Sequence, residues 1–481
     1  MNMRSILTLL IAVMLAPPLA AAATDVRVTV QADAPGSVIP ADFLGLSYEP
    51  PLLATEHFDA ANRMMVQLLR NLGTGVLRFG GNSVDRTFWS REPKATFPDA
   101  KAVLGPGDLD RLFAFSRQTG WPVILGLNLG ALNPDMIADE AAYAVESGQE
   151  RLIAFEIGNE PEMYGKTGVR KSDYTYADYR REVDSCRRAL HARLPKVPLC
   201  GPATAKDFGW FCNFLKDVQL DLVIAARHHY PLSADPNVPV AKPWHASVGN
   251  LLSPATMKKS ADLIRQHQQA AQLAGVPLRL AEGGSASHGG QAGVSDTMAS
   301  ALWTVDYLFT VAELGAAGVN FHGGFACRGY TTFCARGQKC HAHPGYYGML
   351  LFHQAARGRV VPVDCATTLN VTAHAVRGDD GKLRVVLVNK DLTHTATVSV
   401  QAGQAFTKAG IWRLSAPAVT ARDEITFAGG AVEADGTWTP RPPAPATVAD
   451  GKCELTVPSA SAALITFEPD ISREASNGPT K

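Results

Sequence analysis

Short apolar runs alternate with longer amphipathic segments from about residue 40 to residue 357. The segments between the runs place apolar residues at spacings of three and four, as amphipathic helices do. The runs predict strands at Phe43–Ser47, Val76–Phe79, Val123–Leu127, Ile153–Ile157, Pro198–Gly201, Leu222–Ala226, Leu278–Glu282 and Val319–His322. The predicted helices include His57–Leu72, Leu109–Thr119, Asp135–Ser147, Ala177–Leu190, Pro254–Ala274 and Asp296–Leu314. Eight strand–helix units in series are typical of a (β/α)₈ barrel.

The pattern changes after residue 357 to alternating segments that are rich in Val and Thr. These segments are Ala366–Val376, Lys382–Asn389, Ala396–Gln401, Gly410–Leu414 and Lys452–Phe467. They predict a C-terminal antiparallel β-sandwich, and the early alternating segment Val26–Gln31 is expected to add a strand to it. Arg441–Thr447 offers no large apolar side chain and is expected to be a Pro-rich loop. The predicted divisions are therefore 24–39 for the N-terminal strand, 40–357 for the barrel, 358–470 for the sandwich and 471–481 for a disordered tail.

The first residues have the pattern of a secretory signal peptide. Arg4 precedes a ten-residue apolar run, Ile6–Leu15, and the small residues Ala20–Ala23 form an A-x-A cleavage site. Residues 1–23 are therefore expected to be removed. No other apolar run approaches the ~20 residues that span a bilayer. The mature protein is expected to be secreted or periplasmic and free of the membrane.

The overall charge narrows the classes of partner. The 45 Lys and Arg residues balance the 45 Asp and Glu residues, whereas a nucleic-acid-binding protein usually has a basic excess. The same balance argues against a protein built mainly to bind highly sulfated polyanions. The sequence therefore predicts no nucleic-acid partner, and it carries no signal of oligomeric state.

Eight cysteines, an even number, are consistent with an oxidising compartment. Cys334 and Cys340 are close enough in sequence to close one loop, and Cys365 and Cys453 could pair in the C-terminal region, although connectivity cannot be read from a sequence. A zinc site made from Cys327, Cys334, Cys340, His341 and His343 is a weaker hypothesis. The spacing lacks the close ligand pairs of structural zinc sites, so no metal is predicted.

Two glutamates follow predicted barrel strands. Glu160 ends the run Phe155–Glu160, and Glu282 ends the seventh strand. Functional residues of such barrels project from the carboxyl ends of the strands. A single glutamate there is often only a solvated loop residue, but paired carboxylates are what glycoside hydrolysis needs. Asn159 could bind the sugar hydroxyl next to the anomeric carbon, whereas Glu162 is given no catalytic role.

Asn-Glu-Pro at strand 4 with a glutamate at strand 7 is the signature of clan A retaining glycoside hydrolases. Within that clan the chain resembles glycoside hydrolase family 79, the β-glucuronidase and heparanase family, over nearly the whole mature length. The resemblance is carried by Phe43–Glu49, Leu77–Ser83, Phe155–Glu162, Arg227–Pro231, Gly293–Asp296, Val319–His322 and Tyr346–Met349.

The resemblance implies a double displacement that needs no cofactor. Glu160 would be the acid/base, with a raised pKa, and Glu282 the nucleophile, kept ionised. Retention of stereochemistry requires the two carboxyl groups to lie only ~5–5.5 Å apart. Arg78, at the end of strand 2, could hold Glu282 ionised by charge and hydrogen bonding.

The resemblance also suggests which residues bind the sugar. Glu49 and Asn82 would accept or donate hydrogen bonds to hydroxyls, and His229 and Tyr230 would position the nucleophile or the ring. One of His228 and His229 is expected to be a core histidine instead, and the sequence does not say which.

The family binds the carboxylate of glucuronic acid with backbone N–H groups and tyrosine hydroxyls. Gly329 and Tyr330 match the strand-8 part of that arrangement. In the strand-7 loop the family often has Tyr followed by Gly, but this chain has Ser287 and then His288 before Gly289. Ser287 could still donate one hydrogen bond, and the N–H group of Gly289 could help to bind an anion. The missing tyrosine nevertheless weakens the expectation of uronate specificity.

The leading hypothesis is a secreted exo-β-glucuronidase whose partner is a glucuronic-acid-containing oligosaccharide or glycoside. The balanced charge and the insertion Gly323–Pro344, which could close one end of the site, favour exo action. Three alternatives stay open. They are an endo-acting heparanase-like hydrolase, a clan relative such as an arabinofuranosidase or xylosidase, and a non-catalytic carbohydrate-binding protein.

Overall fold

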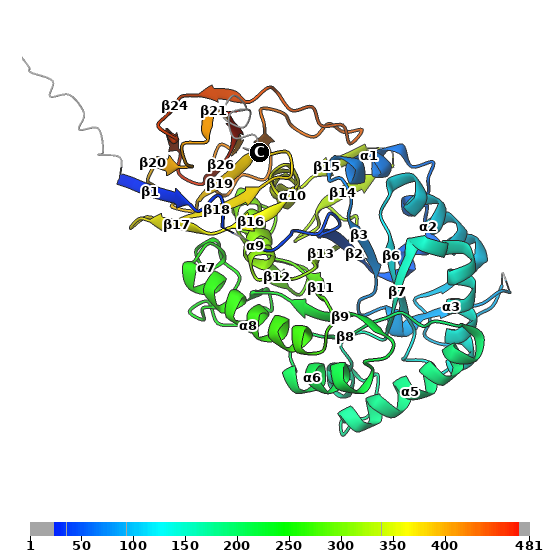
Figure 1. Cartoon of the computed structure of the whole chain (residues 1–481). Helices are drawn as coiled ribbons and strands as arrows, with labels where there is room; N and C mark the ends of the chain where they lie inside the picture. The colour runs from blue at the N-terminus through cyan, green and yellow to red at the C-terminus, as the bar shows by residue number, and fades with distance from the viewer. Residues whose placement is uncertain (1–23, 35, 93, 338, 471–481) are drawn as a thin grey trace, which may run out of the picture.

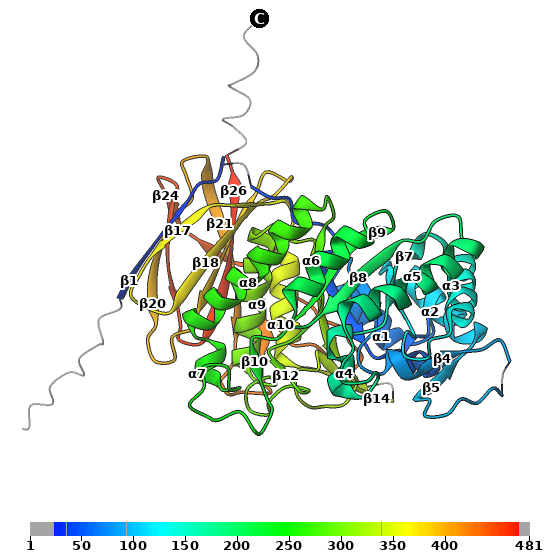
Figure 2. The same ribbon diagram turned by 90° about the horizontal axis from the view of Figure 1, so that it is seen from below.

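The computed structural model describes residues 24–34, 36–92, 94–337 and 339–470. The predicted signal peptide and the predicted tail lie outside these residues. A closed barrel and a two-sheet sandwich lie side by side, and the N-terminal strand lies among the sandwich strands (Figures 1 and 2). Within the described ranges, no helix has the length and apolar character needed to cross a membrane.

The barrel consists of eight parallel strands, and all eight predicted strands are confirmed. They are β2 (Leu44–Tyr48), β3 (Val76–Phe79), β6 (Val123–Leu127), β7 (Leu152–Ile157), β8 (Leu199–Thr204), β9 (Leu222–His229), β11 (Leu278–Gly283) and β13 (Gly318–Gly323). Most bounds agree to within one residue, but β8 and β9 each continue three residues beyond the prediction. The strands form continuous apolar runs because both faces of a parallel sheet are covered.

Helices cover the outside of the barrel (Figure 1). They are α1 (Arg63–Asn71), α2 (Pro106–Thr119), α3 (Pro134–Gly148), α5 (Tyr176–Arg193), α6 (Phe208–Asp217), α8 (Pro254–Leu273), α9 (Met298–Glu313) and α10 (Pro344–Ala355). The predicted start of α1 at His57 was too early. The helix begins after Asn62, whose side chain accepts a hydrogen bond from the Met65 amide at 3.3 Å and so caps it.

The sandwich has two sheets. One contains β17 (Val363–Ala366), β1 (Thr24–Val30), β20 (Ala396–Gln401), β25 (Lys452–Val457) and β24 (Val448–Ala449), in that order. The other contains β16 (Arg359–Val361), β18 (Val371–Arg377), β19 (Leu383–Asn389), β26 (Ser461–Pro469), β21 (Phe406–Ser415) and β22 (Thr426–Phe427). The N-terminal strand joins the first sheet as predicted. It pairs antiparallel with β17 but parallel with β20, so this sheet is not purely antiparallel.

Three sequence-based boundaries in the sandwich were wrong. The segment Ala366–Val376 begins at the last residue of β17 and includes β18, which lies in the other sheet. The segment Lys452–Phe467 is two strands, β25 and β26, which lie in different sheets. The expected loop Arg441–Thr447 contains a short strand, β23 (Ala444–Ala446), which pairs with Ala409–Ile411 of β21. Proline is tolerated there because β23 lies at a sheet edge, where its missing N–H costs no ladder hydrogen bond.

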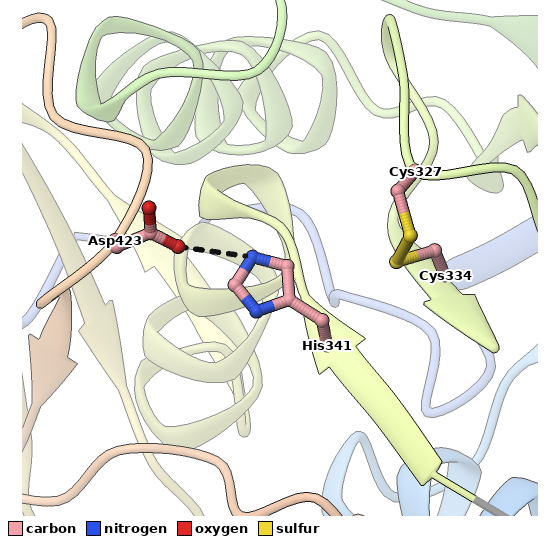
Figure 3. The surroundings of a disulfide bond; sticks show 4 residues. All are labelled: Cys327, Cys334, His341 and Asp423. Carbon is pink, nitrogen blue, oxygen red and sulfur yellow. Dashed lines mark ion pairs between the residues drawn. A yellow bond between two sulfur atoms is a disulfide. The ribbon is translucent and has the colours of Figure 1, made fainter. Parts of the chain in front are cut away.

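Cys334 forms a disulfide with Cys327, so the suggested pairing with Cys340 was wrong (Figure 3). Cys340 is free, and its thiol lies 3.4 Å from the Glu433 carbonyl oxygen. The suggested pair Cys365–Cys453 is also wrong. Both are free, and their strands β17 and β25 are separated by β1 and β20, which places them about 14 Å apart at the usual strand spacing.

Two of the five residues of the weaker zinc hypothesis, Cys327 and Cys334, form this disulfide and are therefore not free to bind a metal. Another, His341, lies 3.4 Å from the Asp423 carboxylate (Figure 3). Among the described residues, these cysteines and histidines do not gather into a group that could hold an ion.

A buried charged cluster joins the barrel to the sandwich. His374 of β18 lies between two carboxylates of α9, with Nε2 3.0 Å from Asp306 and Nδ1 2.6 Å from Glu313. Lys390 and Thr372 also bind Asp306. Burial alone would lower the pKa of His374, but Glu313 and Asp306 outweigh it and raise that pKa to about 9. The imidazolium therefore links the two parts of the chain.

The stability of the protein is expected to depend on the charge of His374. The pKa of His374 is raised above the unfolded value of about 6.5, so its contribution is complete below pH ~6.5 and is lost as the pH rises through about 9. We expect His374→Gln to lower the free energy of unfolding by about 2–3 kcal/mol at pH 6, and by much less at pH 9.5.

Thermal unfolding of both proteins at the two pH values measures this difference. The exposed His341 gives a control, because His341→Gln is expected to change stability by no more than about 0.5 kcal/mol. An equal loss for His374→Gln at both pH values would contradict the role of its charge.

Candidate active site

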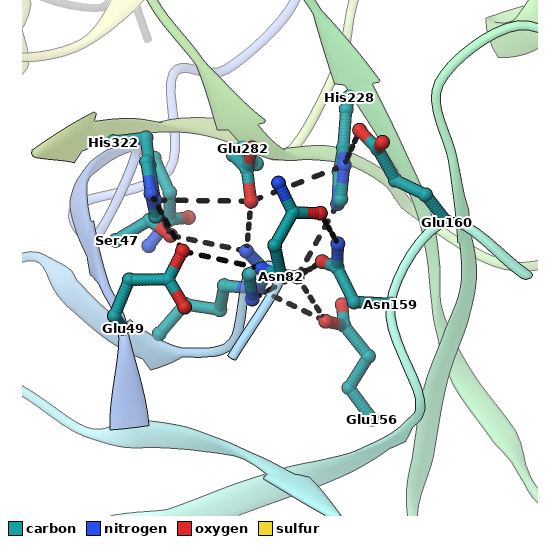
Figure 4. A network of polar contacts seen from close by, with 12 residues as sticks. Ser47, Glu49, Asn82, Glu156, Asn159, Glu160, His228, Glu282 and His322 are labelled. Carbon is teal, nitrogen blue, oxygen red and sulfur yellow. Dashed lines mark hydrogen bonds and ion pairs between the residues drawn. The ribbon is translucent and has the colours of Figure 1, made fainter. Parts of the chain in front are cut away.

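Glu160 and Glu282 meet at the carboxyl ends of the barrel strands. Carboxylate oxygens of both residues and a ring nitrogen of His228 lie within 4.8 Å of one another. Figure 4 shows Glu282 between His322 and His228, with Glu160 on the far side of His228. The two glutamates, 122 residues apart in sequence, therefore face one site.

The site rests on an apolar layer inside the barrel. That layer includes Val76, Ile124, Ala154, Cys200, Ala226 and Ala281. Side chains of a strand alternate between its faces, so the residues two positions further along β3, β7 and β9 also point inward. These residues are Arg78, Glu156 and His228, and they form a polar layer directly above the apolar one.

Glu282 reaches this layer because β11 is irregular. The register of β11 against β9 shifts between Leu280 and Glu282. A regular strand would place neighbouring residues Ala281 and Glu282 on opposite faces, and the irregularity re-aims the glutamate, as bulges often do next to active sites. Its carboxylate accepts hydrogen bonds from Arg78 Nη1 at 2.7 Å and from the Tyr230 hydroxyl at 2.9 Å.

The surroundings keep Glu282 ionised. Burial alone would raise its pKa, but His322 and Arg78 outweigh burial and hold the pKa of Glu282 far below its ordinary value. His322 lies 3.7 Å from the carboxylate, and the pKa of His322 is itself raised against burial by Glu282 and Glu49. The carboxylate is therefore negatively charged at neutral pH, as a nucleophile must be.

Arg78 organises the floor of the site. Its guanidinium is fully buried and donates to Glu156, Glu282, Ser47 and Asn159. Burial would lower its pKa, but Glu156 and Glu282 raise it above the ordinary value. An arginine cannot be deprotonated here, so the site holds one fixed positive charge.

Glu160 lies against His228. His228 Nε2 is 3.3 Å from Arg78 Nη2, and a guanidinium only donates hydrogen bonds, so Nε2 must accept. The ring proton is then on Nδ1, which donates to Glu160 Oε1 at 2.9 Å. Oε1 of Glu160 is therefore the acceptor of this hydrogen bond.

Glu49 is held by the turn that follows β3. Its carboxylate accepts hydrogen bonds from the amides of Asn82 at 3.2 Å and Ser83 at 2.8 Å, and from the Ser83 hydroxyl. Gly81 allows this approach, because its φ is 108° and a Cβ there would lie 2.6 Å from Glu49 Oε1. Burial opposes ionisation of Glu49, but His322 and Ser83 lower its pKa.

Asn159 and Asn82 are linked. The Asn159 side-chain oxygen accepts from Arg78 at 2.9 Å and from the Gly81 amide at 3.1 Å. Its NH₂ group must therefore point the other way, where it lies 3.3 Å from Asn82 Oδ1. Asn159 presents a donor to the site, as a group that binds a sugar hydroxyl would.

The loops predicted to bind a carboxylate pack against each other. The Tyr330 amide donates to the Gly289 carbonyl at 3.3 Å, and a Cβ at Gly329 would lie 1.7 Å from the same oxygen. The Tyr330 amide is therefore not free to bind a ligand, contrary to the expectation. The Tyr330 ring lies 5.7 Å from the Tyr230 ring and faces the site, while the Ser287 hydroxyl lies 3.1 Å from His288 Nδ1.

The placement of His229 in the site was wrong. His229 points towards the helices, with its ring 5.7 Å from Tyr307 of α9, and burial beside Arg227 lowers its pKa to about 3. The site residue of this strand is His228, and His322 was also missed. Every second residue of a strand faces the same way, so the inward-facing Ala226 and Asn320 would have predicted that His228 and His322 also face inward.

A pocket of ≈ 390 Å³ opens beside Glu160, between the loops that follow β3 and β7. Its lining includes Asn82, Asp85, Asn159 and Tyr164. Glu160, His228 and Glu282 are close enough together to hold a metal ion, but such an ion would lie next to the guanidinium of Arg78, whose charge opposes it.

Comparison with known proteins finds similarity to glycoside hydrolases. A model of the C-terminal β domain of glycosyl hydrolase family 79 matches residues 373–464. A β-glucuronidase from Neurospora crassa is 25% identical over 303 residues, which cover 55% of this chain and 53% of that protein. Heparanase-like protein 3 from Arabidopsis thaliana is 22% identical over 390 residues, which cover 73% and 68%. The chain thus spans about half the length of the Neurospora protein.

Solved structures share the fold. A 4-O-α-L-rhamnosyl-β-D-glucuronidase from Fusarium oxysporum matches with a TM-score of 0.78 and 22% identity, over 92% of this chain and 100% of that one. A family 51 arabinofuranosidase from Xanthomonas axonopodis pv. citri matches with a TM-score of 0.69 and 17% identity, over 92% and 100%. With its paired glutamates on this barrel and these likenesses, the chain resembles the glycoside hydrolases of family 79.

Proposed function

We propose that the protein is an exported, retaining exo-β-glucuronidase that removes terminal β-linked glucuronic acid from glycans or glycosides. The observation that carries the retaining mechanism is the spacing of Glu160 and Glu282, whose oxygens lie within 4.8 Å of each other. Retaining enzymes separate the two carboxyl groups by about 5–5.5 Å, whereas inverting enzymes leave about 6.5–9.5 Å for a water molecule.

The reaction takes two steps. Glu282 attacks the anomeric carbon while the bond to the leaving oxygen breaks, and that oxygen takes the proton of Glu160. Glu160 then removes a proton from a water molecule, whose oxygen displaces Glu282 from the sugar. Arg78, at 2.7 Å, and Tyr230, at 2.9 Å, hold the nucleophile during both steps.

The order of residues around the mouth orients the sugar. With its 2-hydroxyl at Asn159, a sugar bonded to Glu282 would present its 3-hydroxyl to Asn82, its 4-hydroxyl to Glu49 and its C5 group to Tyr330. This sequence follows the strand order β7, β3, β2 and β13, with β6 between β7 and β3. The uronate carboxyl group would then face Tyr330 and the Ser287 loop.

A wall beside Glu49 supports exo action. Phe325, from the loop after β13, stacks on His57 with ring centroids 3.9 Å apart and on Tyr48 at 5.3 Å. This contact joins the loops after β13 and β2 at the side of the mouth where the 4-hydroxyl would lie. We expect these joined loops to block a chain that continued from that hydroxyl.

The Cys327–Cys334 disulfide of the loop that supplies Tyr330 supports export. Disulfides persist mainly outside the cytosol, which agrees with the signal-peptide pattern of residues 1–23.

Tyr330→Phe tests the uronate part of the proposal. Because a hydrogen bond to a charged group contributes about 1.5–3 kcal/mol, kcat/KM for a nitrophenyl β-glucuronide should fall about 10- to 100-fold. The matching β-xyloside, which lacks the carboxylate, should lose less than about threefold. Equal losses on both substrates would contradict a contact between Tyr330 and the carboxylate.

The occupied Tyr330 amide and the serine at position 287 favour a second candidate, a β-glycosidase for a sugar without a C5 carboxylate. A panel of nitrophenyl β-glucuronide, β-glucoside, β-galactoside, β-xyloside and α-arabinofuranoside separates the two. The proposal expects the highest kcat/KM on the glucuronide, and NMR of the first-formed product should show the β-anomer. A preference for another sugar rejects the glucuronidase, and an inverted product rejects the retaining mechanism.

A further inference from the structure

The peptide that carries the acid/base is strained. Glu160 has φ 47° and ψ 53°, a left-handed conformation that residues other than glycine rarely adopt. Such conformations cost free energy and persist only where the surroundings hold them. Two backbone hydrogen bonds contribute, from the Glu160 amide to the Ala203 carbonyl at 3.1 Å and from the Met163 amide to the Glu160 carbonyl at 2.8 Å.

The residue before Glu160 is held by a side chain. The Asn159 amide donates to the Tyr164 hydroxyl oxygen at 3.3 Å. The Tyr164 side chain is almost completely buried and lies against Asp85. Gly158 makes room for it, because φ there is 75° and a Cβ would lie 2.3 Å from the Tyr164 oxygen.

Asp85 is itself fixed by a third segment. Its Oδ1 accepts a hydrogen bond from the Gly130 amide, in the loop after β6, at 3.0 Å. Arg170 covers the Tyr164 ring, with its guanidinium carbon 5.5 Å from the ring centre, and donates to the carbonyls of Leu129 and Gly130. Three loops of the mouth therefore meet at this tyrosine and this aspartate.

We propose that Asp85 and Tyr164 are positioning residues for acid catalysis, which hold the Asn159–Glu160 peptide so that the Glu160 carboxyl group reaches the glycosidic oxygen. Neither residue bonds to Glu160 or Glu282 themselves, so the effect passes through the backbone of Asn159. This inference rests on the proposed acid/base role of Glu160.

The test is the dependence of kcat/KM on the leaving group. For a retaining glycosidase kcat/KM reports the first step, in which a poor leaving group needs a proton and a good one needs little. Tyr164→Phe removes only the hydroxyl. We expect it to lower kcat/KM by about tenfold or more for an aryl glycoside with a poor leaving group, and by less than about threefold for one with a good leaving group.

Tyr176→Phe is the matched control. Tyr176 also donates its hydroxyl to an aspartate, Asp217, at 2.9 Å, but it is half-buried on the outside of the barrel. The control should leave the leaving-group dependence of kcat/KM unchanged, even if both variants lower Tm equally. If Tyr164→Phe lowered kcat/KM by the same factor for every leaving group, or changed only KM, the positioning role would be overturned.

Asp85 offers a second variant if Tyr164→Phe does not fold. Asp85→Asn keeps an acceptor for Tyr164, so its leaving-group dependence should stay closer to wild type than that of Asp85→Ala. Equal behaviour of these two variants would also overturn the inference.

Glu160→Ala on the same substrates separates this inference from the proposed function. If Glu160→Ala shows the leaving-group dependence and Tyr164→Phe does not, only the positioning role fails. If Glu160→Ala shows none, the acid role of Glu160 and the inference fail together.

Discussion

Glu282→Gln is expected to lower kcat on the preferred substrate by ~10⁴-fold or more, because it removes the nucleophile of the first step. The amide fits the same space and keeps an oxygen for Arg78. Its NH₂ group replaces the oxygen that Tyr230 contacts, and it cannot form the glycosyl ester. Covalent labelling by a mechanism-based inhibitor, followed by mass spectrometry of the intact protein, should also disappear.

Glu162→Gln is the control for this change. Glu162 belongs to the same mouth, but its Oε1 accepts hydrogen bonds from the amides of Ala205 at 2.6 Å and Lys206 at 2.9 Å, and an amide oxygen can do the same. Labelling should persist in that variant. Labelling that also persisted in Glu282→Gln would show that another group attacks the sugar.

Glu160→Ala is expected to produce the second large loss. General acid catalysis contributes about 10²–10⁴-fold, so substrates with poor leaving groups should lose that much in kcat/KM, and those with good leaving groups much less. Because the same residue must also deprotonate water, the second step should slow for every substrate, and the glycosyl-enzyme should accumulate with a good leaving group.

Rapid-quench kinetics and mass spectrometry measure this accumulation. An equal loss of kcat/KM across leaving groups, without accumulation, would assign the acid role elsewhere. His228 is the neighbour to examine in that case, since its Nδ1 lies 2.9 Å from Glu160 and 4.0 Å from Glu282.

The barrel could be predicted because its signal is local. Each strand is a short apolar run between polar segments, so β3 and β6 were placed to the residue. The two-strand nature of Lys452–Phe467 was missed because alternation continues through the turn that separates β25 from β26.

The site was predictable in part. Glu160, Glu282, Arg78 and Tyr230 follow from strand ends and from family resemblance, and the structure brings them together. His228 was not separated from His229, because both follow Arg227 at the end of one strand and only the direction of the strand's faces distinguishes them. The irregularity of β11 that aims Glu282, and the Gly289–Tyr330 contact that occupies an amide, depend on pairing between distant segments.

The position of β1 makes the barrel an insertion within the sandwich. This strand lies between β17 and β20, so the first described residues of the chain complete a sheet whose other strands come more than 300 residues later. During synthesis β1 cannot pair until the entire barrel and then β17 and β20 have been made. Pairing between segments so far apart in sequence is slow to form. A fragment limited to residues 373–464, the part that the family model matches, would lack β1 and β17 and leave β20 with an open edge prone to self-association.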